Sequence, residues 1–347
     1  MFYLKYRPHT IAELDNTAVK ETISNVLRSP NLPHAYLFIG QKGMGKTSTA
    51  RIVAKAVNCE KNKYSGVGTS IEPCNTCANC KAIDAGYSPD VIEQDAASNR
   101  GIDEIRNLIR ESAFAPMTGR FRVFIIDEAH MITNDAFNAL LKTLEEPPKQ
   151  VLFILATTNE EKIPKTIASR AMRINFGKAR LTDIVSMLQR IAKGEKINAS
   201  DELLTFIAER ADYSFRDATR MLEEVTMQNK LSVEEARAYL GVTSKNNFLE
   251  LLANKSSLHE ALPWIQQFTE SGGSIKLFLE DLLHMLELQL MHKSGVVQEG
   301  VEDVPLSIKE IALLMKLLNE AYASLRNSPI EAVPLEIAVV EFYNMRT

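Results

Sequence analysis

The sequence predicts a parallel α/β domain followed by helical domains, on three observations. Short apolar segments at 35–39, 122–126 and 151–156 each end at a glycine or a polar residue, as buried strands of a parallel sheet do. Stretches with helical spacing of apolar residues separate these segments, which is the alternation that a parallel sheet requires. After Phe176 the strand signals stop, and apolar residues recur three and four positions apart to the end of the chain.

The composition is that of an ordinary globular protein. The 347 residues are 45% hydrophobic and 24% charged, which excludes wholesale disorder. No apolar run approaches the roughly 20 residues of a membrane span and the N-terminus lacks a secretory pattern, so we expect a cytoplasmic protein without membrane contact. The net charge of −4 argues against a general nucleic-acid-binding chain. Residues 1–176 hold 22 Lys and Arg against 19 Asp and Glu, whereas 177–347 hold 18 against 25, so a polyanion would bind the first part.

A glycine-rich loop follows the first predicted strand. Gly40-Gln41-Lys42-Gly43-Met44-Gly45-Lys46-Thr47 fits the pattern G-x-x-x-x-G-K-[ST], and a helical pattern follows at 48–57. In this context, backbone N–H groups of the loop wrap around phosphates. Lys46 would reach the β- and γ-phosphates of a nucleoside triphosphate, and the Thr47 hydroxyl would bind Mg²⁺. The alternative is a chance turn rich in Gly and Lys.

Polar residues follow the other two predicted strands. Asp127 and Glu128 come after 122–126; the first could hold Mg²⁺ and the second could deprotonate an attacking water, unless the pair is a solvated turn. Thr157, Thr158 and Asn159 come after 151–156. One of them could polarise the water or sense the γ-phosphate, and a helix N-cap is the alternative.

All four cysteines lie close together in the sequence, at Cys59, Cys74, Cys77 and Cys80. This spacing in a cytosolic chain favours a closed, structural zinc site with four thiolate ligands. Disulfides are disfavoured in that compartment, and a redox Cys-x-x-Cys does not explain three evenly spaced cysteines. An iron–sulfur cluster is chemically possible, but no electron-transfer motif accompanies it.

Two arginines are candidates for contact with phosphate. Arg170 follows the third strand, where ring-forming ATPases can present an arginine to the γ-phosphate of the next subunit. The alternative is a helix-terminal arginine paired with a carboxylate. Arg216 begins a helix in the second half of the chain and could fold over the nucleotide of its own chain.

With these motifs, the chain resembles the gamma/tau family of bacterial DNA polymerase III clamp-loader ATPases, in the AAA+ superfamily. The resemblance covers almost the whole chain. It rests on the phosphate loop, the cysteine insertion and Asp127-Glu128-Ala129-His130, together with Lys5-Tyr6-Arg7-Pro8, Asp95-Ala96-Ala97-Ser98, residues 137–148 and Leu155-Ala156-Thr157-Thr158-Asn159. Phosphate loops occur in many families, whereas the cysteine insertion and the segment 137–148 are specific.

The resemblance implies three domains and a set of nucleotide-binding residues. It implies an AAA+ P-loop ATPase domain at 1–176 with a zinc module at 59–80, a helical lid domain at 177–242 and a helical collar domain for oligomerisation at 243–347. Thr158, or less favourably Thr157, would be the first sensor, Arg216 the second sensor, and Arg170 the arginine that acts in trans. The residues implied to bind ATP are Tyr6, Arg7, Pro8 and His34 around the adenine, and Gly40, Gly43, Met44, Gly45, Lys46, Thr47 and Ser48 in the loop and its helix.

The family also implies an activity and partners. The chain would be the ATP-dependent motor that loads the sliding clamp onto primer-template DNA, in a pentameric ring with delta and delta-prime subunits and further gamma/tau copies, at the nucleoid-associated replisome in the cytoplasm. Arg100, Arg106 and Lys142 would contact DNA phosphates, although each alone reads as a solvated surface charge. The family carries the DNA-directed DNA polymerase label (EC 2.7.7.7, a nucleotidyltransferase) of its holoenzyme, but the sequence shows no polymerase active site.

The main alternative is a non-hydrolysing, delta-prime-like subunit of the same ring, which generally has a damaged phosphate loop; the loop here is intact. A branch-migration helicase would not be expected to carry the cysteine insertion. The chain departs from the family pattern at Ala171, where Cys is usual, and at Tyr213, where Gly is usual. If the chain ends at Thr347, we expect a gamma-like form, because tau-type chains extend well beyond the collar.

Overall fold

A computed structural model describes residues 1–98, 101–211, 213–240, 243–253, 258–270, 274–295, 304–325 and 328–345. The chain divides into two compact units, Met1–Val233 and Glu234–Thr347.

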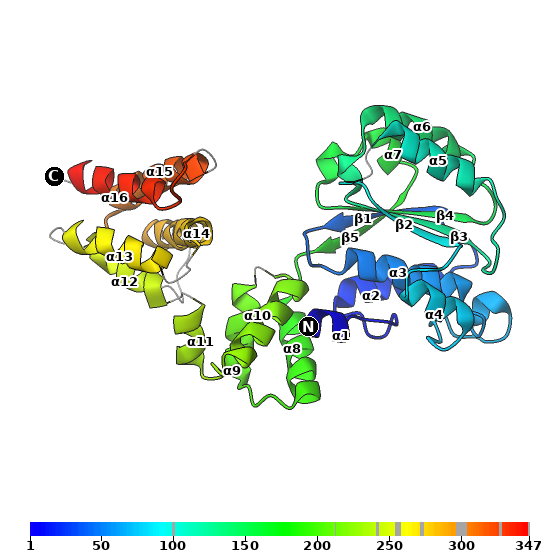
Figure 1. The fold of residues 1–347 in the computed structure, drawn as a ribbon, viewed down its shortest axis with the longest axis horizontal. Coiled ribbons are helices and arrows are strands. Elements are labelled where there is room, and N and C mark those ends of the chain that lie inside the picture. Colours follow the sequence, from blue (N-terminus) through cyan, green and yellow to red (C-terminus); the bar gives the residue numbers. More distant parts are fainter. Residues whose placement is uncertain are drawn as a thin grey trace. The chain divides into compact units, whose positions relative to one another are not determined.

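The first unit is built on a five-stranded parallel sheet in the order β2-β3-β4-β1-β5 (Figure 1). β1, β3 and β4 are the predicted strands, and they occupy the middle of the sheet. Both of their faces are covered, which is why the sequence shows them as continuous apolar runs. The strands are β1 (Ala35–Gly40), β2 (Val91–Asp95), β3 (Arg122–Asp127), β4 (Val151–Thr157) and β5 (Met172–Gly177).

The edge strands β2 and β5 were not among the predicted strands. In β5 only Ile174 and Phe176 are buried, and in β2 no residue is fully buried. Because edge strands are covered less completely than central ones, polar residues alternate with apolar ones along β5 and break the apolar run that marks a central strand.

Helices cover both faces of the sheet (Figure 1). On one face, α5, α6 and α7 contribute side chains such as Leu108, Phe137 and Ile167 to a core shared with β1, β3 and β4. On the other face lie α2, α3 and α4, with α3 packed against β1, β3 and β4. The helices of this part are α1 (Phe2–Lys5), α2 (Thr17–Arg28), α3 (Lys46–Asn58), α4 (Ala78–Asp84), α5 (Ile102–Ser112), α6 (Asn134–Glu145) and α7 (Lys165–Ala168), with short 3₁₀ turns η1 (Lys63–Ser65), η2 (Ala129–Met131) and η3 (Glu160–Lys162).

Three further helices complete the first unit: α8 (Leu181–Glu195), α9 (Asp201–Arg210) and α10 (Phe215–Met227). The side chains of Ser200 and Ser214 accept hydrogen bonds from the first turns of α9 and α10, and so fix where these helices begin. α10 packs against α8, α9 and the N-terminal α1. The sheet and these helices belong to one compact unit, so the division at 176 into an ATPase domain and a lid stays a prediction.

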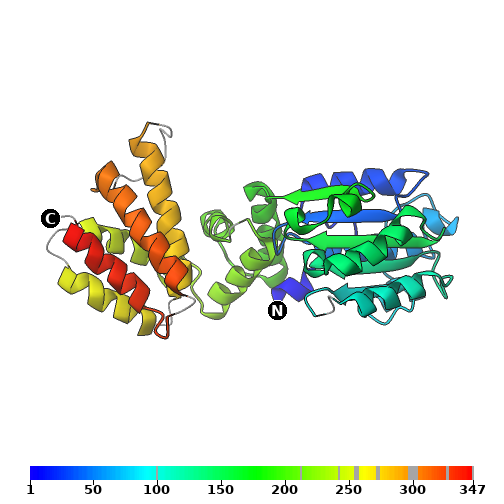
Figure 2. The ribbon, with the colours of Figure 1, turned by 90° about the horizontal axis from the view of Figure 1, so that it is seen from above.

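The second unit is entirely helical within its described residues (Figure 2). α15 packs against α14 and α16, and α13 packs against α12 and α16, around a core that includes Phe248, Leu282 and Phe342. The helical prediction after β5 is therefore confirmed. The predicted boundary at 242 falls outside the described residues, whereas the compact units divide at Val233. The helices are α11 (Val233–Tyr239), α12 (Thr243–Ala253), α13 (Leu258–Glu270), α14 (Ile275–Lys293), α15 (Ile308–Ser324) and α16 (Val333–Met345).

None of the helices in the described ranges has both the length and the apolar character needed to cross a bilayer.

Candidate active site

The phosphate loop joins β1 to α3 at the carboxyl edge of the sheet. Gly43 and Gly45 have φ angles of +83° and +87°, in the left-handed region that strongly favours glycine. A Cβ at Gly43 would in addition collide with the hydroxyl of Ser214 at the start of α10. Gly43 is therefore required both by the turn and by the close approach of α10, whereas Gly45 is required by the turn alone.

A cavity of about 510 Å³ opens beside this loop. The N-terminal segment, the ends of β2 and β3, and the first turn of α10 complete its walls. The predicted residues that line it are Tyr6, Arg7, Pro8, Gly43, Met44, Gly45, Lys46, Thr47, Ser48, Asp127, Glu128 and Arg216. Residues far apart in the sequence thus converge on one site.

Thr47 and Asp127 meet at the floor of the cavity. The Thr47 hydroxyl donates a hydrogen bond of 2.6 Å to Oδ2 of Asp127. The other oxygen, Oδ1, accepts the backbone N–H of Glu128 at 2.9 Å. A hydroxyl and a carboxylate side by side are the hard oxygen ligands that Mg²⁺ prefers, so these two residues could hold that ion.

Positive side chains face the same cavity. Lys46 is buried, and its Nζ donates to the carbonyls of Gly40 and Gln41 at 2.8 and 2.9 Å. Burial lowers the pKa of the Lys46 ammonium, and the nearby Glu128 and Asp127 oppose this shift. Arg7 donates from Nε to Oγ of Ser48 at 2.8 Å. Clustered cations on a glycine-rich loop at a helix N-terminus are suited to a polyphosphate.

Glu128 has a left-handed backbone, with φ +47°, and its carboxylate lines the cavity. Its Oε2 accepts a hydrogen bond of 3.0 Å from the Thr158 hydroxyl. Thr157 is fully buried, and its hydroxyl bonds the backbone of Asn159. Asn159 occupies the N-cap position of η3, as the N-cap alternative predicts, but its side chain makes no capping hydrogen bond. Among Thr157, Thr158 and Asn159, Thr158 is the residue whose hydroxyl contacts Glu128.

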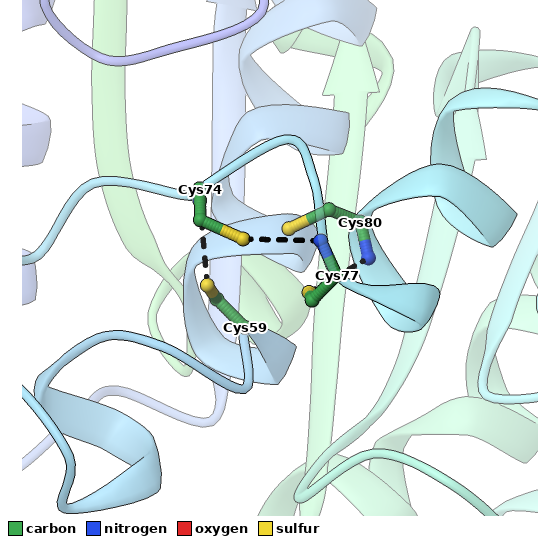
Figure 3. Close-up of side chains that lie close together, drawn as sticks. All are labelled: Cys59, Cys74, Cys77 and Cys80. Carbon is green, nitrogen blue, oxygen red and sulfur yellow. Dashed lines mark hydrogen bonds between the residues drawn. The ribbon is translucent and has the colours of Figure 1, made fainter.

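The four cysteines form a second, separate cluster (Figure 3). Their sulfur atoms all lie within 4.8 Å of one another, and all but Cys74 are buried. The backbone N–H groups of Cys74 and Cys77 point to the sulfurs of Cys59 and Cys74, each at 3.3 Å. Burial alone would raise the pKa of the Cys74 thiol, but hydrogen bonds from Thr76 and Cys77 bring it down to about 6. Four converging sulfurs with N–H donors fit a tetrahedral zinc ion.

Comparisons with known proteins identify the family. A family model described as "DNA polymerase III, delta subunit" matches residues 15–180. The chain is 35% identical to DNA polymerase III subunit tau of Bacillus subtilis over 98% of its own length, and it spans 62% of the length of that relative. It is 30% identical to DNA polymerase III subunit gamma of Buchnera aphidicola (subsp. Baizongia pistaciae), over 99% of this chain and 96% of the relative. The chain belongs to the gamma/tau family of DNA polymerase III subunits.

Among solved structures, the Holliday junction branch migration motor RuvB of Thermotoga maritima aligns with a TM-score of 0.49 and 16% sequence identity. The alignment covers 100% of this chain and 91% of the RuvB chain.

One residue that the gamma/tau resemblance assigned to the adenine lies elsewhere. His34 is not among the residues that line the cavity, and its Nε2 bonds the carbonyl of Leu144 in α6 at 2.9 Å. It precedes β1, whereas the phosphate loop follows β1, and a strand of six residues separates the two by about 20 Å. The assignment of His34 to the nucleotide is therefore corrected. Gly40 is also not among the residues that line the cavity, but its carbonyl accepts a hydrogen bond from Lys46.

Arg170 lies away from the cavity of its own chain and pairs with Glu145. Ala171, where the family usually has Cys, packs against the core beneath α6 and α7. Of the three DNA-contact candidates, Arg106 on α5 and Lys142 on α6 are exposed on adjacent helices. Arg100 lies outside the described residues.

Several residues that line the cavity were not predicted from the sequence. Asp95 ends β2 and pairs in register with Asp127 at the end of β3. Because the carboxyl ends of parallel strands lie at the same edge of a sheet, Asp95 could have been predicted as a site residue if β2 had been predicted. Tyr3 lies with its ring centroid 5.6 Å from the Arg216 guanidinium. No local signal marks Tyr3, because only the packing of α1 against α10 brings it to the site.

Proposed function

We propose that this chain is the ATPase subunit of a bacterial sliding-clamp loader. The observation that carries the proposal is the 2.6 Å bond between Thr47 of the phosphate loop and Asp127 of β3, on a cavity that Lys46 and Glu128 also line. These are the groups that hydrolysis of a nucleoside triphosphate needs: a phosphate cradle, a cation, a metal site and a base. Membership in the gamma/tau family supplies the biological setting.

In this proposal the triphosphate lies on the loop, and Lys46 moves from the carbonyls of Gly40 and Gln41 to the β- and γ-phosphates. Glu128 takes a proton from water as the water oxygen bonds to the γ-phosphorus, and the bond to the β–γ bridging oxygen breaks to release ADP and phosphate. Mg²⁺, held by Thr47 and Asp127, would offset the negative charge on the phosphates. Thr158 orients the carboxylate of Glu128.

Two further arginines act on the phosphates in this scheme. Arg216, at the start of α10, reaches the nucleotide of its own chain, because it lines the same cavity. Arg170 is exposed enough to serve a neighbour, with 35% of its side chain accessible, and we propose that it completes the site of the adjacent subunit in the ring. Tyr6, Arg7 and Pro8 border the base.

The partners in the proposal are those that the family resemblance implies. They are delta and delta-prime subunits and further copies of this chain in a pentamer, the sliding clamp and primer-template DNA, at the replisome in the cytoplasm. The cysteine cluster binds a structural zinc ion, since four sulfurs leave no open coordination position. The activity proposed for this chain is ATP hydrolysis; nucleotidyl transfer belongs to the polymerase subunits of the holoenzyme.

The test is ATP hydrolysis by the chain mixed with delta, delta-prime, clamp and primed DNA. We expect Lys46→Ala to abolish the DNA-stimulated rate and Lys193→Ala, an exposed position on α8, to leave it unchanged. A mixture whose rate does not differ between the native chain and Lys46→Ala would contradict the motor assignment. The non-hydrolysing, delta-prime-like role would then be the better description.

A further inference from the structure

His130 lies beside the carboxylate of Glu128, in the turn η2 that directly follows it. Its Nδ1 lies 3.3 Å from Oε2 of Glu128 and 3.2 Å from Oγ1 of Thr157. The side chain is only 13% exposed, and it is not among the residues that line the cavity. His130 belongs to a segment that carries the family resemblance, Asp127-Glu128-Ala129-His130, but no function was predicted for it.

The hydrogen bonds of Thr157 indicate which ring nitrogen of His130 carries a hydrogen. The Thr157 hydroxyl has one proton, which it donates to the carbonyl of Asn159 at 3.0 Å, and the same oxygen accepts the Asn159 N–H at 3.0 Å. Toward His130 the hydroxyl can therefore only accept. Nδ1 must then carry the hydrogen that joins the two side chains.

The carboxylate of Glu128, the second neighbour of Nδ1, independently indicates the same tautomer. An ionised carboxylate only accepts hydrogen bonds. A lone pair on Nδ1 at 3.3 Å from Oε2 of Glu128 would repel it, whereas an N–H at that distance attracts it. Thr157 and Glu128 thus both select the tautomer with hydrogen on Nδ1, which lies between their two oxygens.

We infer that His130 is a positioning residue for Glu128, acting through its Nδ1–H; this rests on the proposed ATPase. The histidine and the Thr158 hydroxyl both contact the same oxygen, Oε2 of Glu128. Glu128 also has a left-handed backbone, a conformation that costs free energy in a non-glycine residue and persists only where the surrounding structure holds it. No group in the described part of the chain donates to Oε1. With Oε2 held in this way, Oε1 is the oxygen that would receive the proton of the attacking water.

The kinetic test compares three substitutions in the assembled loader. His130→Asn places an amide N–H close to the position of Nδ1, His130→Gln places it near Nε2, and His130→Leu removes it. We expect kcat to fall about tenfold in the Leu and Gln variants with KM for ATP unchanged, and to stay within about threefold of the native value in the Asn variant. Native kcat in His130→Leu, or equal losses in the Asn and Leu variants, would overturn the inference.

The tautomer can be measured on the native chain without any substitution in the measured sample. With ¹⁵N-labelled histidine, long-range ¹H–¹⁵N spectra at pH 8 distinguish hydrogen on Nδ1 from hydrogen on Nε2, and the His130 signals are those lost in His130→Asn. We expect hydrogen on Nδ1; hydrogen on Nε2 would overturn the inference. If the native loader hydrolyses no ATP, the proposed function fails instead, and the spectrum still decides which tautomer His130 adopts.

Discussion

Arg170 and Glu145 form an ion pair within the chain, with Nη2 of the arginine 2.5 Å from Oε1 of the glutamate. Nη1 of the same guanidinium donates to the carbonyl of Thr166 at 2.7 Å, one turn back. The side chain is thus held by α6 and α7 on the surface of its own chain. The sequence left two roles open for Arg170, a trans-acting group and a helix-terminal partner of a carboxylate; within one chain the second arrangement is present.

We predict that Arg170→Ala lowers kcat of the assembled loader by about 10³-fold or more, because arginines that act in trans on phosphoryl transfer are worth that much. An exposed ion pair contributes about 0–1 kcal/mol, so the melting temperature should hardly change. Arg173→Ala, on β5 and more exposed, is the matched control, since it removes a surface pair with Glu160. Full activity of the Arg170→Ala loader would leave only the structural role.

The cysteine cluster should hold one zinc ion per chain, measured by elemental analysis of the purified protein. We predict that Cys77→Ser lowers zinc content and the thermal stability of the first unit, because three thiolates leave the site incomplete. Thr76→Ala is the control: it removes one hydroxyl donor to Cys74 and keeps all four sulfurs. A native chain without zinc, with iron in its place, would favour the iron–sulfur alternative.

Tyr213 occupies a position whose backbone suits glycine, with φ +59°. Because a left-handed non-glycine residue costs about 1–2 kcal/mol, we predict that Tyr213→Gly raises the free energy of unfolding of the first unit by about 1 kcal/mol. Urea unfolding followed by far-UV circular dichroism would show this. Trp264 fluorescence reports the second unit and should not shift.

Lys178→Ala is the control for the tyrosine ring, since the Lys178 ammonium lies 5.3 Å from the centroid of that ring. If loss of this cation–π contact explained a change at Tyr213, the lysine variant would show the same effect. If Tyr213→Gly instead lowered the free energy of unfolding, the contacts of the tyrosine ring would stabilise the fold by more than the left-handed backbone destabilises it.

Arg106 and Lys142 lie on adjacent exposed helices, α5 and α6, and Arg106 has 59% of its side chain accessible. We predict that the double substitution to alanine weakens DNA stimulation of ATP hydrolysis and reduces its dependence on salt, since each lost phosphate contact lowers the slope by about one. Lys81→Ala, exposed on α4, is the control. Unchanged stimulation in the double variant would remove these residues from the DNA-binding face.

The central strands and the phosphate loop were predictable from the sequence because their signals are local. A strand buried on both faces must be apolar throughout, and a loop that turns between β1 and α3 with positive φ angles at Gly43 and Gly45 must carry glycine there. The clustering of the cysteines followed from their spacing in the same way. In each case the residues that define the feature lie within one short segment of the chain.

Tertiary structure alone decided the features that depend on distant segments. The edge strands β2 and β5 lack an apolar run because neither is fully covered. His34 lies at the wrong end of β1 for the nucleotide, although it is close to the loop in sequence. The hydrogen inferred on Nδ1 of His130 depends in part on Thr157, which ends β4 and lies far from His130 in the sequence. Local sequence patterns determine whether a segment forms a strand or a loop. Burial and the direction of a hydrogen bond depend on pairs of residues that are distant in the sequence and meet only when the chain folds.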